Sequence, residues 1–157
     1  MIEIDVNERV ERAKEYFKSG YNCAQAVAMA YNDIMDMSVE QVAKLAAPFG
    51  GGMGRMREVC GTVSGMAMLA GAIKPAVNPQ NLEERKENYA LVQHFADKFR
   101  VENGDIVCRR LLGLEPMVER AETPMPSERT SEYYKKRPCV EYVGCAARIV
   151  GEYLATK

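Results

Sequence analysis

Apolar positions recur along most of the chain at intervals of three and four residues, the spacing that is typical of amphipathic helices. The first such stripe covers residues 6–17 and stops before Gly20. No segment of useful length alternates between apolar and polar residues as a strand does, and no internal repeat is evident. The pattern predicts an all-α fold, a single-domain multi-helix bundle of about six to eight helices over residues 1–157.

Start and stop residues divide this pattern into separate helices. Asn22 is expected to cap the second helix, and Ser38 with Gln41 matches a capping box that opens the third. The expected helices cover about residues 6–18, 23–35, 38–47, 60–73, 81–101, 105–112 and 139–155. The inward face of the longest is expected to carry Leu82, Tyr89, Val92, Phe95, Ala96 and Phe99. The proline-containing residues 115–137 are expected to be irregular, with one short helix near Ser127–Lys135.

Composition narrows the function classes. The 157 residues are 47% hydrophobic and carry a formal net charge of −1, which gives no reason to expect a nucleic acid or an anionic membrane as partner. No apolar run is long enough for a membrane span, and the N-terminus has no apolar signal region. A cytoplasmic location is therefore expected, where thiols are usually reduced, catalytic or metal-bound.

Five cysteines and a single histidine are the main candidates for chemistry. Cys23, Cys60, Cys108 and Cys139 each stand where a helix is expected to begin, whereas Cys145 lies inside the last helix. Free N–H groups and partial positive charge at a helix N-terminus stabilise a thiolate, which is both the nucleophile and the metal ligand. No CxxC, zinc-ribbon or CxxCH spacing occurs, so a shared site has to be assembled from separate helices.

Three interpretations of these cysteines remain open from the residues alone. Four converging thiolates can hold an iron–sulfur cluster or zinc, and two thiols can cycle through a disulfide. Cysteine is also a common buried residue that packs as a small hydrophobe, and for Cys145 this structural role is favoured. His94 lies in the long amphipathic helix and is expected to be a partly buried structural residue rather than a ligand.

A glycine-rich stretch precedes Cys60. It does not spell a nucleotide-binding fingerprint, and no Walker lysine follows it. Consecutive glycines let another group approach the backbone closely, so the stretch can wrap a cluster, a flavin edge or a small anion, or can simply form a tight turn. The candidate cofactor-binding residues are Gly50, Gly51, Gly52, Gly54 and Arg55. Arg55 and Arg57 can lower the pKa of the Cys60 thiol or pair with an anion, or can be solvated surface residues.

Five sequence blocks occur in an order that resembles a known family. They are residues 21–27 (YNCAQAV), 49–55 (FGGGMGR), 58–65 (EVCGTVSG), 108–113 (CRRLLG) and Cys139 at the start of the last helix. In this order they resemble the C_GCAxxG_C_C family, which is described as redox-active, over roughly residues 9–155. The resemblance implies that Cys23, Cys60, Cys108 and Cys139 are the functional set and that Cys145 is outside it. One departure is Thr62, which stands where the family pattern has alanine.

The resemblance also bears on cofactors and context. The family is similar to part of split-Soret cytochromes, which implies a bound iron–sulfur centre, although this chain lacks their haem-attachment motif. Family members also lie near transporter genes, which implies a role accessory to transport.

Taken together, these features favour a cytoplasmic helical redox protein in which Cys23, Cys60, Cys108 and Cys139 converge on one site. Metal ligation, as an iron–sulfur cluster, is favoured slightly over a thiol–disulfide couple. In the couple, Cys60 is expected to attack first because Arg55 and Arg57 can lower its pKa.

The alternative is a non-catalytic helical binding or adaptor protein, accessory to a transporter, with structural cysteines. The redox reading fits an oxidoreductase or an electron-transfer protein whose electron donor or acceptor the residues do not identify. The small residues of 60–73 suit a homodimer interface and an internal core equally well.

Overall fold

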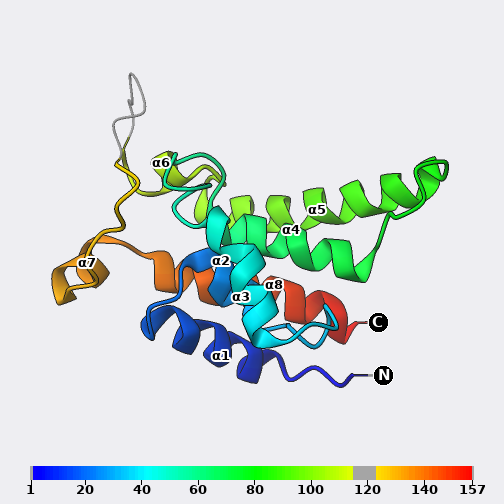
Figure 1. Ribbon diagram of the computed structural model, residues 1–157, viewed down its shortest axis with the longest axis horizontal. Helices are drawn as coiled ribbons and strands as arrows, with labels where there is room; N and C mark the ends of the chain where they lie inside the picture. The colour runs from blue at the N-terminus through cyan, green and yellow to red at the C-terminus, as the bar shows by residue number, and fades with distance from the viewer. Residues whose placement is uncertain (1, 115–122, 157) are drawn as a thin grey trace.

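The structure is a computed structural model that describes residues 2–114 and 123–156, which form eight α-helices and one short 3-10 helix (Figure 1). In chain order these are α1 Val6–Lys18, α2 Cys23–Met29, α3 Val39–Ala46, η1 Ala47–Phe49, α4 Gly61–Ile73, α5 Leu82–Asn103, α6 Cys108–Leu111, α7 Ser131–Lys136 and α8 Cys139–Ala155. Within the described residues the only extended pairing is an isolated antiparallel bridge between Val59 and Val107. The expected all-α class and the expected number of helices are confirmed.

Helix α2 lies at the centre of the packing. It contacts α4 most extensively, and α1, α3 and α8 pack around it. Its alanines are fully buried, and Gly65 of α4 lets the two backbones approach, because a Cβ there would lie 3.0 Å from Cβ of Val27. Seven of the thirteen residues of α4 are buried in this packing.

Side-chain caps fix where several helices begin. The Asn22 side chain accepts a hydrogen bond from Gln25 N at 2.9 Å, and the Gln25 side chain accepts one from Asn22 N at 3.0 Å, which is the reciprocal pattern of a capping box. Ser38 and Gln41 form the same box at α3. Both predicted caps are confirmed, and the Asn22 box places Cys23 at the first position of α2.

The second helix is shorter than expected. It ends at Met29 instead of about residue 35, and the chain continues through turns in which Asp36 has a left-handed φ of 55°. The reason is tertiary: the buried Arg9 guanidinium of α1 donates to Ala30 O at 2.8 Å and forms a bidentate ion pair with Asp33 at 2.6 and 2.7 Å. Contacts from a distant helix therefore end α2 where no local stop residue does.

The inward face expected for α5 is correct only in its C-terminal half. Phe95 and Phe99 are buried, but Leu82 is 70% exposed and Tyr89 is 58% exposed. The N-terminal half of α5 runs with α4 away from the rest of the molecule (Figure 1), so its apolar side chains have little to pack against.

The segment between α6 and α8 is mainly irregular where it is described, as expected. Residues 115–122 of that segment lie outside the described residues. The short helix expected near Ser127–Lys135 is observed as α7, which begins at Ser131 and ends at Lys136. No helix in the described parts of the chain is long and apolar enough to cross a membrane.

Candidate thiol redox site

Four cysteines stand at helix starts, as the sequence predicts. Cys23, Cys108 and Cys139 are the first residues of α2, α6 and α8, and Cys60 is the N-cap residue of α4. Cys145 lies in the interior of α8.

All four of these cysteines line one cavity of about 60 Å³, a volume that holds only one or two waters. The described residues around it are Phe17, Asn22, Cys23, Gly51, Arg57, Cys60, Gly61, Thr62, Cys108, Leu111, Leu112, Arg129, Tyr133, Arg137, Cys139 and Tyr142. The helix starts therefore meet at the glycine turn. We call this space the thiol cavity.

The glycine-rich stretch forms a tight left-handed turn beside the thiol cavity. Gly51 and Gly52 have φ of 65° and 70°, and the non-glycine residues Met53, Arg55 and Arg57 also have φ above 60°. Such values are uncommon for side chains with a Cβ and are often held in place at functional sites. Gly52 has a second constraint, because a Cβ there would lie 2.7 Å from Cβ of Cys108.

Gly61 brings the starts of α2 and α4 together. A Cβ at this position would lie 2.5 Å from Sγ of Cys23 and 3.1 Å from Ala24 N, so only glycine allows the approach. The N–H of Cys60 donates to Ile106 O at 2.8 Å, and the N–H of Cys108 donates to Glu58 O at 2.6 Å. These two bonds fix the backbones of Cys60 and Cys108 relative to each other.

Cys23 is the most acidic thiol of the site. A hydrogen bond from the Cys60 thiol lowers the pKa of Cys23 to about 6, with further help from the N–H groups of Gly51 and Ala24. Burial acts in the opposite direction but is outweighed. Cys23 is therefore largely a thiolate at neutral pH, and the glycine turn supplies one of its donors.

Cys60 has the opposite character. Its hydrogen bond to Cys23, its burial and the negative charge on Cys23 raise the pKa of Cys60 well above its ordinary value. The Thr62 hydroxyl lies 3.0 Å from Sγ of Cys60 and acts in the lowering direction without reversing the result. The pKa shifts of the two thiols therefore run in opposite directions, lowered at Cys23 and raised at Cys60.

The two arginines expected to activate Cys60 make other contacts. Arg57 is 3% exposed, and its Nη1 donates to Sγ of Cys108 at 3.7 Å. Arg55 donates to Thr123 O at 3.1 Å and to Ser127 Oγ at 3.2 Å. Neither is among the groups that shift the pKa of Cys60 most.

Cys108 and Cys139 remain protonated at neutral pH. Burial is the largest cause in both, and it raises the pKa of Cys139 to about 12. Arg57 lowers the pKa of Cys108, but less than burial raises it.

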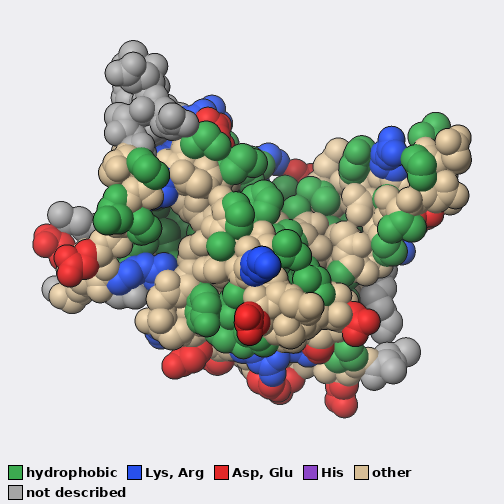
Figure 2. Space-filling view, viewed as in Figure 1, with side chains coloured by type: hydrophobic (Ala, Val, Ile, Leu, Met, Phe, Trp, Pro, Cys, Tyr) green, Lys and Arg blue, Asp and Glu red, His purple; other side chains and the backbone are tan. Residues whose placement is uncertain are grey.

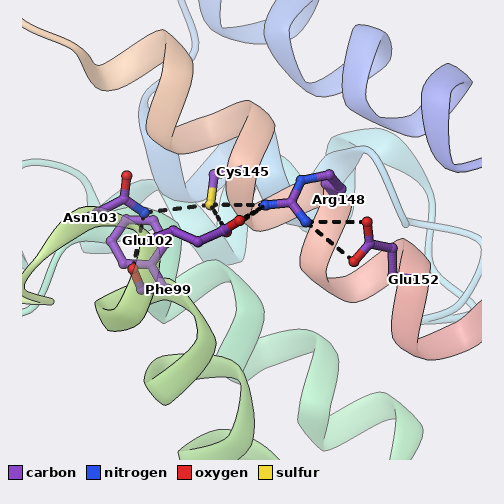
Figure 3. Close-up of polar contacts among 6 residues, drawn as sticks. All are labelled: Phe99, Glu102, Asn103, Cys145, Arg148 and Glu152. Carbon is purple, nitrogen blue, oxygen red and sulfur yellow. Dashed lines mark hydrogen bonds and ion pairs between the residues drawn. The ribbon is translucent and has the colours of Figure 1, made fainter.

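Cys145 belongs to a different part of the molecule. Its thiol donates to Glu102 Oε2 at 3.0 Å and accepts from Asn103 Nδ2 at 3.4 Å, and Arg148 bridges the same carboxylate (Figure 3). Burial and the Glu102 carboxylate raise the pKa of Cys145 to about 11. It does not line the thiol cavity, in agreement with its predicted exclusion from the functional set.

His94 does not reach the thiol cavity either. It is exposed rather than partly buried, and its ring lies 5.9 Å from that of Tyr153, on the surface shared by α5 and α8. The sequence reasoning missed the wall formed by Arg129, Tyr133 and Arg137. The signal was weak: basic and aromatic residues cluster just before Cys139 in a segment that otherwise reads as a loop.

The fit of a metal to this site can be tested on the positions of its donors. Within residues 2–114 and 123–156, no group of three or more histidine, cysteine or acidic side chains is arranged to hold a metal ion. All four thiols line the same cavity, and the interaction with Cys60 is the largest cause of the pKa shift of Cys23.

The fold and the site together define a class, that of all-helical proteins whose helix starts gather cysteines around one small cavity. The chain belongs to the C_GCAxxG_C_C family, since the family model described as "Putative redox-active protein (C_GCAxxG_C_C)" matches residues 21–153, a range that includes all four cysteines of the cavity. The resemblance noted in the sequence is thereby confirmed. No curated protein and no solved structure matches the chain.

Proposed function

We propose that the protein is a thiol–disulfide oxidoreductase in which Cys23 is the attacking thiol and Cys60 the resolving thiol. The observation that supports it most is that both side chains line the thiol cavity, where the start of α4 comes so close to Cys23 that a Cβ on Gly61, the residue after Cys60, would lie 2.5 Å from Sγ of Cys23. A nucleophile and its resolving partner have to be within contact distance for a disulfide to close between them.

The reaction balances with a disulfide substrate, RSSR. The Cys23 thiolate attacks one sulfur, a Cys23–SR bond forms, the S–S bond breaks, and RS⁻ leaves and takes a proton. Cys60 then loses its proton and attacks Sγ of Cys23, which expels the second RS⁻. The protein ends with a Cys23–Cys60 disulfide and has lost two electrons, and the substrate has become two thiols. In the reverse direction the protein oxidises two thiols.

The two steps place different demands on the two thiols. The first needs a thiolate at neutral pH, which Cys23 provides. In the second step the charge on Cys23 is gone once the mixed disulfide forms, so two of the causes that raise the pKa of Cys60 disappear. Cys60 is therefore activated only after Cys23 has reacted, and this order prevents the pair from competing for the substrate.

The test uses reduced protein and the uncharged disulfide 2-hydroxyethyl disulfide, with intact mass and peptide mapping as the readout. The wild type should form a Cys23–Cys60 disulfide. Cys60→Ser should stop at a mixed disulfide on Cys23, and Cys23→Ser should lose the rapid reaction. Cys145→Ser is the matched control and should behave as the wild type does.

Two results would overturn the proposal. One is a first disulfide that joins other cysteines. The other is a set of thiols that stay inert until the protein unfolds, which is the behaviour expected of a non-catalytic binding or adaptor protein with structural cysteines.

A metal site is the second candidate, and the observation in its favour is that all four helix-start cysteines line the same cavity. Cys23, Cys60, Cys108 and Cys139 would hold an iron–sulfur cluster or zinc, and the N–H of Gly51, which also lines the cavity, would donate to the Cys23 sulfur. A bound cluster would supply one-electron transfer. The four sulfurs would have to approach one another more closely than the described arrangement has them.

Cys108→Ser and Cys139→Ser separate the two candidates. The dithiol reaction should survive both substitutions, whereas a four-cysteine site should lose its metal in each. Iron, zinc and acid-labile sulfide are measured on wild-type protein purified without oxygen. Stoichiometric metal that depends on all four cysteines would establish the second candidate in place of the first.

A further inference from the structure

A second cavity, of about 320 Å³, adjoins the thiol cavity. This volume is at the lower end of the range in which proteins bind small molecules. The two cavities share the lining residues Asn22, Gly51, Arg57, Arg129, Tyr133 and Arg137. A molecule in the second cavity therefore lies next to the thiols. We call this space the outer cavity.

Arg129 forms a fixed positive charge between the two cavities. Its guanidinium donates to Phe17 O at 2.8 Å and to Tyr21 O at 2.9 Å, and it lies 4.1 Å over the ring of Phe17. Backbone carbonyls orient the group without neutralising it. Because guanidinium groups bind carboxylates through two parallel N–H donors, an oriented one is a suitable anchor for an anion.

Arg137 adds a second positive charge beside Tyr133. The two guanidinium groups lie 5.4 Å (Arg129) and 5.1 Å (Arg137) from the centre of that ring. Among the described residues, no carboxylate forms an ion pair with either arginine, and none lines the outer cavity. The charges of both arginines reach the thiol cavity, since each lowers the pKa of Cys139 against the effect of burial.

The surface shows the same distribution of charge. Lys and Arg side chains gather beside a hollow next to α7, and no acidic side chain stands within that hollow in this view (Figure 2). The outer cavity is lined by residues of the turn before α4 on one side and by residues 124–137 on the other.

We infer that the disulfide exchanged at Cys23 is a small one whose halves carry carboxylates, and that Arg129 and Arg137 hold such a carboxylate in the outer cavity while its sulfur faces the thiol cavity. This inference rests on the thiol–disulfide function proposed above and adds the class of substrate. The electron balance is unchanged: one S–S bond of the substrate is reduced and two anionic thiols are released. The carboxylate of each released thiol is attracted to the arginines, so the thiol stays beside them briefly before it leaves.

The experiment compares three disulfides of similar size as oxidants of the reduced protein. Dithiodipropionic acid is anionic, 2-hydroxyethyl disulfide is uncharged and cystamine is cationic. Each rate constant is divided by that of the same disulfide with free 2-mercaptoethanol, which removes differences in intrinsic reactivity. The anionic disulfide should react about tenfold faster than the uncharged one at low salt, and the cationic one more slowly. The advantage should shrink as salt is added.

Substitutions test whether these arginines are responsible. Arg137→Gln should reduce the advantage of the anionic disulfide over the uncharged one about fivefold. Arg85→Gln is the matched control, because Arg85 is an exposed arginine that lines a shallow surface pocket on α5. Arg129→Lys keeps the charge but alters the two bonds to backbone carbonyls, so it should lower the advantage less than Arg137→Gln does.

The outcomes distinguish this inference from the function on which it rests. If all three disulfides oxidise Cys23 and Cys60 at equal normalised rates, at low and at high salt, the thiol–disulfide function stands and the anionic substrate class is wrong. If none of the three reacts with the folded protein, the proposed function itself fails. A cationic preference would also overturn the inference.

Discussion

At the scale of single residues, the site depends on an unequal pair of thiols. Cys23 is half-buried and Cys60 is buried, and both line the thiol cavity beside the glycine turn, yet one thiol is acidic and the other is held protonated. The difference comes from hydrogen bonds, because Cys60 and the backbone N–H groups of Gly51, Ala24 and Cys23 itself all lower the pKa of Cys23. Burial alone would raise the pKa of both.

The pair can be tested by titration. In the reduced wild type, the rate of alkylation of Cys23 by iodoacetamide should rise around pH 6 and level off near pH 7, following its pKa of about 6. Cys60→Ala removes the largest cause of that low value, so the midpoint should move toward or beyond the ordinary value of 9.0. Peptide mapping assigns the rate to Cys23.

Cys145→Ser is the control for this titration, because its thiol lies in the Glu102 network and does not line the thiol cavity. The profile of Cys23 should be unchanged in that variant. An unchanged midpoint in Cys60→Ala would contradict the assigned hydrogen bond.

At the scale of elements, two glycines of α4 have opposite roles. At Gly61 an added Cβ would lie 2.5 Å from Sγ of Cys23 and 3.0 Å from Phe49 O, whereas at Gly71 it would meet nothing within 4 Å. Gly61 therefore serves the close approach of α2 and α4, and Gly71 carries only the entropic cost of a glycine within a helix.

Substitutions at these two positions should change stability in opposite directions. Gly61→Ala should lower the free energy of unfolding by about 1–3 kcal/mol, the usual cost of overpacking, and should slow the alkylation of Cys23. Gly71→Ala should raise it by about 0.5–1 kcal/mol and leave the thiol unaffected. Urea unfolding of the reduced proteins measures both. Equal effects of the two substitutions would show that the contact at Gly61 does not exist.

Local signals in the sequence were enough to predict the helices and the placement of the cysteines. The capping boxes at Asn22 and Ser38 are made by residues a few positions apart, so they can be read from the chain. The end of α2 could not be read from the chain, since it depends on a contact with Arg9 of another helix. The exposure of Leu82 could not be predicted either, because an amphipathic pattern does not show how far the neighbouring helices extend.

The same distinction applies to the site. That four cysteines begin helices follows from local pattern, and that they form one family set follows from resemblance. Which two of them touch depends on the packing of α2 against α4, and that packing depends on a glycine whose role is visible only in space. The cationic wall of Arg129 and Arg137 comes from the proline-containing segment, where the cluster of basic and aromatic residues before Cys139 was too weak a signal to assign it to the cavity.

At the scale of the whole molecule, the acidity of Cys23 links the site to the stability of the fold. Between about pH 6 and pH 9 the folded protein has released a proton that the unfolded chain still binds on this thiol. The unfolded state therefore binds more protons, and stability rises with pH in this window. Above it the sign reverses, because Cys60, Cys139 and Cys145 have raised pKa values and keep protons that the unfolded chain releases.

The contribution of Cys23 can be isolated by difference. The free energy of unfolding of the reduced wild type, minus that of Cys23→Ser, should grow between pH 6 and pH 8 by on the order of 1 kcal/mol per pH unit, with an upper limit of about 1.4 kcal/mol per unit for a single proton. Urea unfolding in the presence of a phosphine reductant at pH 6, 7 and 8 measures this difference. Cys145→Ser should run parallel to the wild type, because a pKa of about 11 lies outside the window. If wild type and Cys23→Ser also ran parallel, Cys23 would not be a thiolate in the folded protein, and the proposed nucleophile would have to be sought among the other thiols of the cavity.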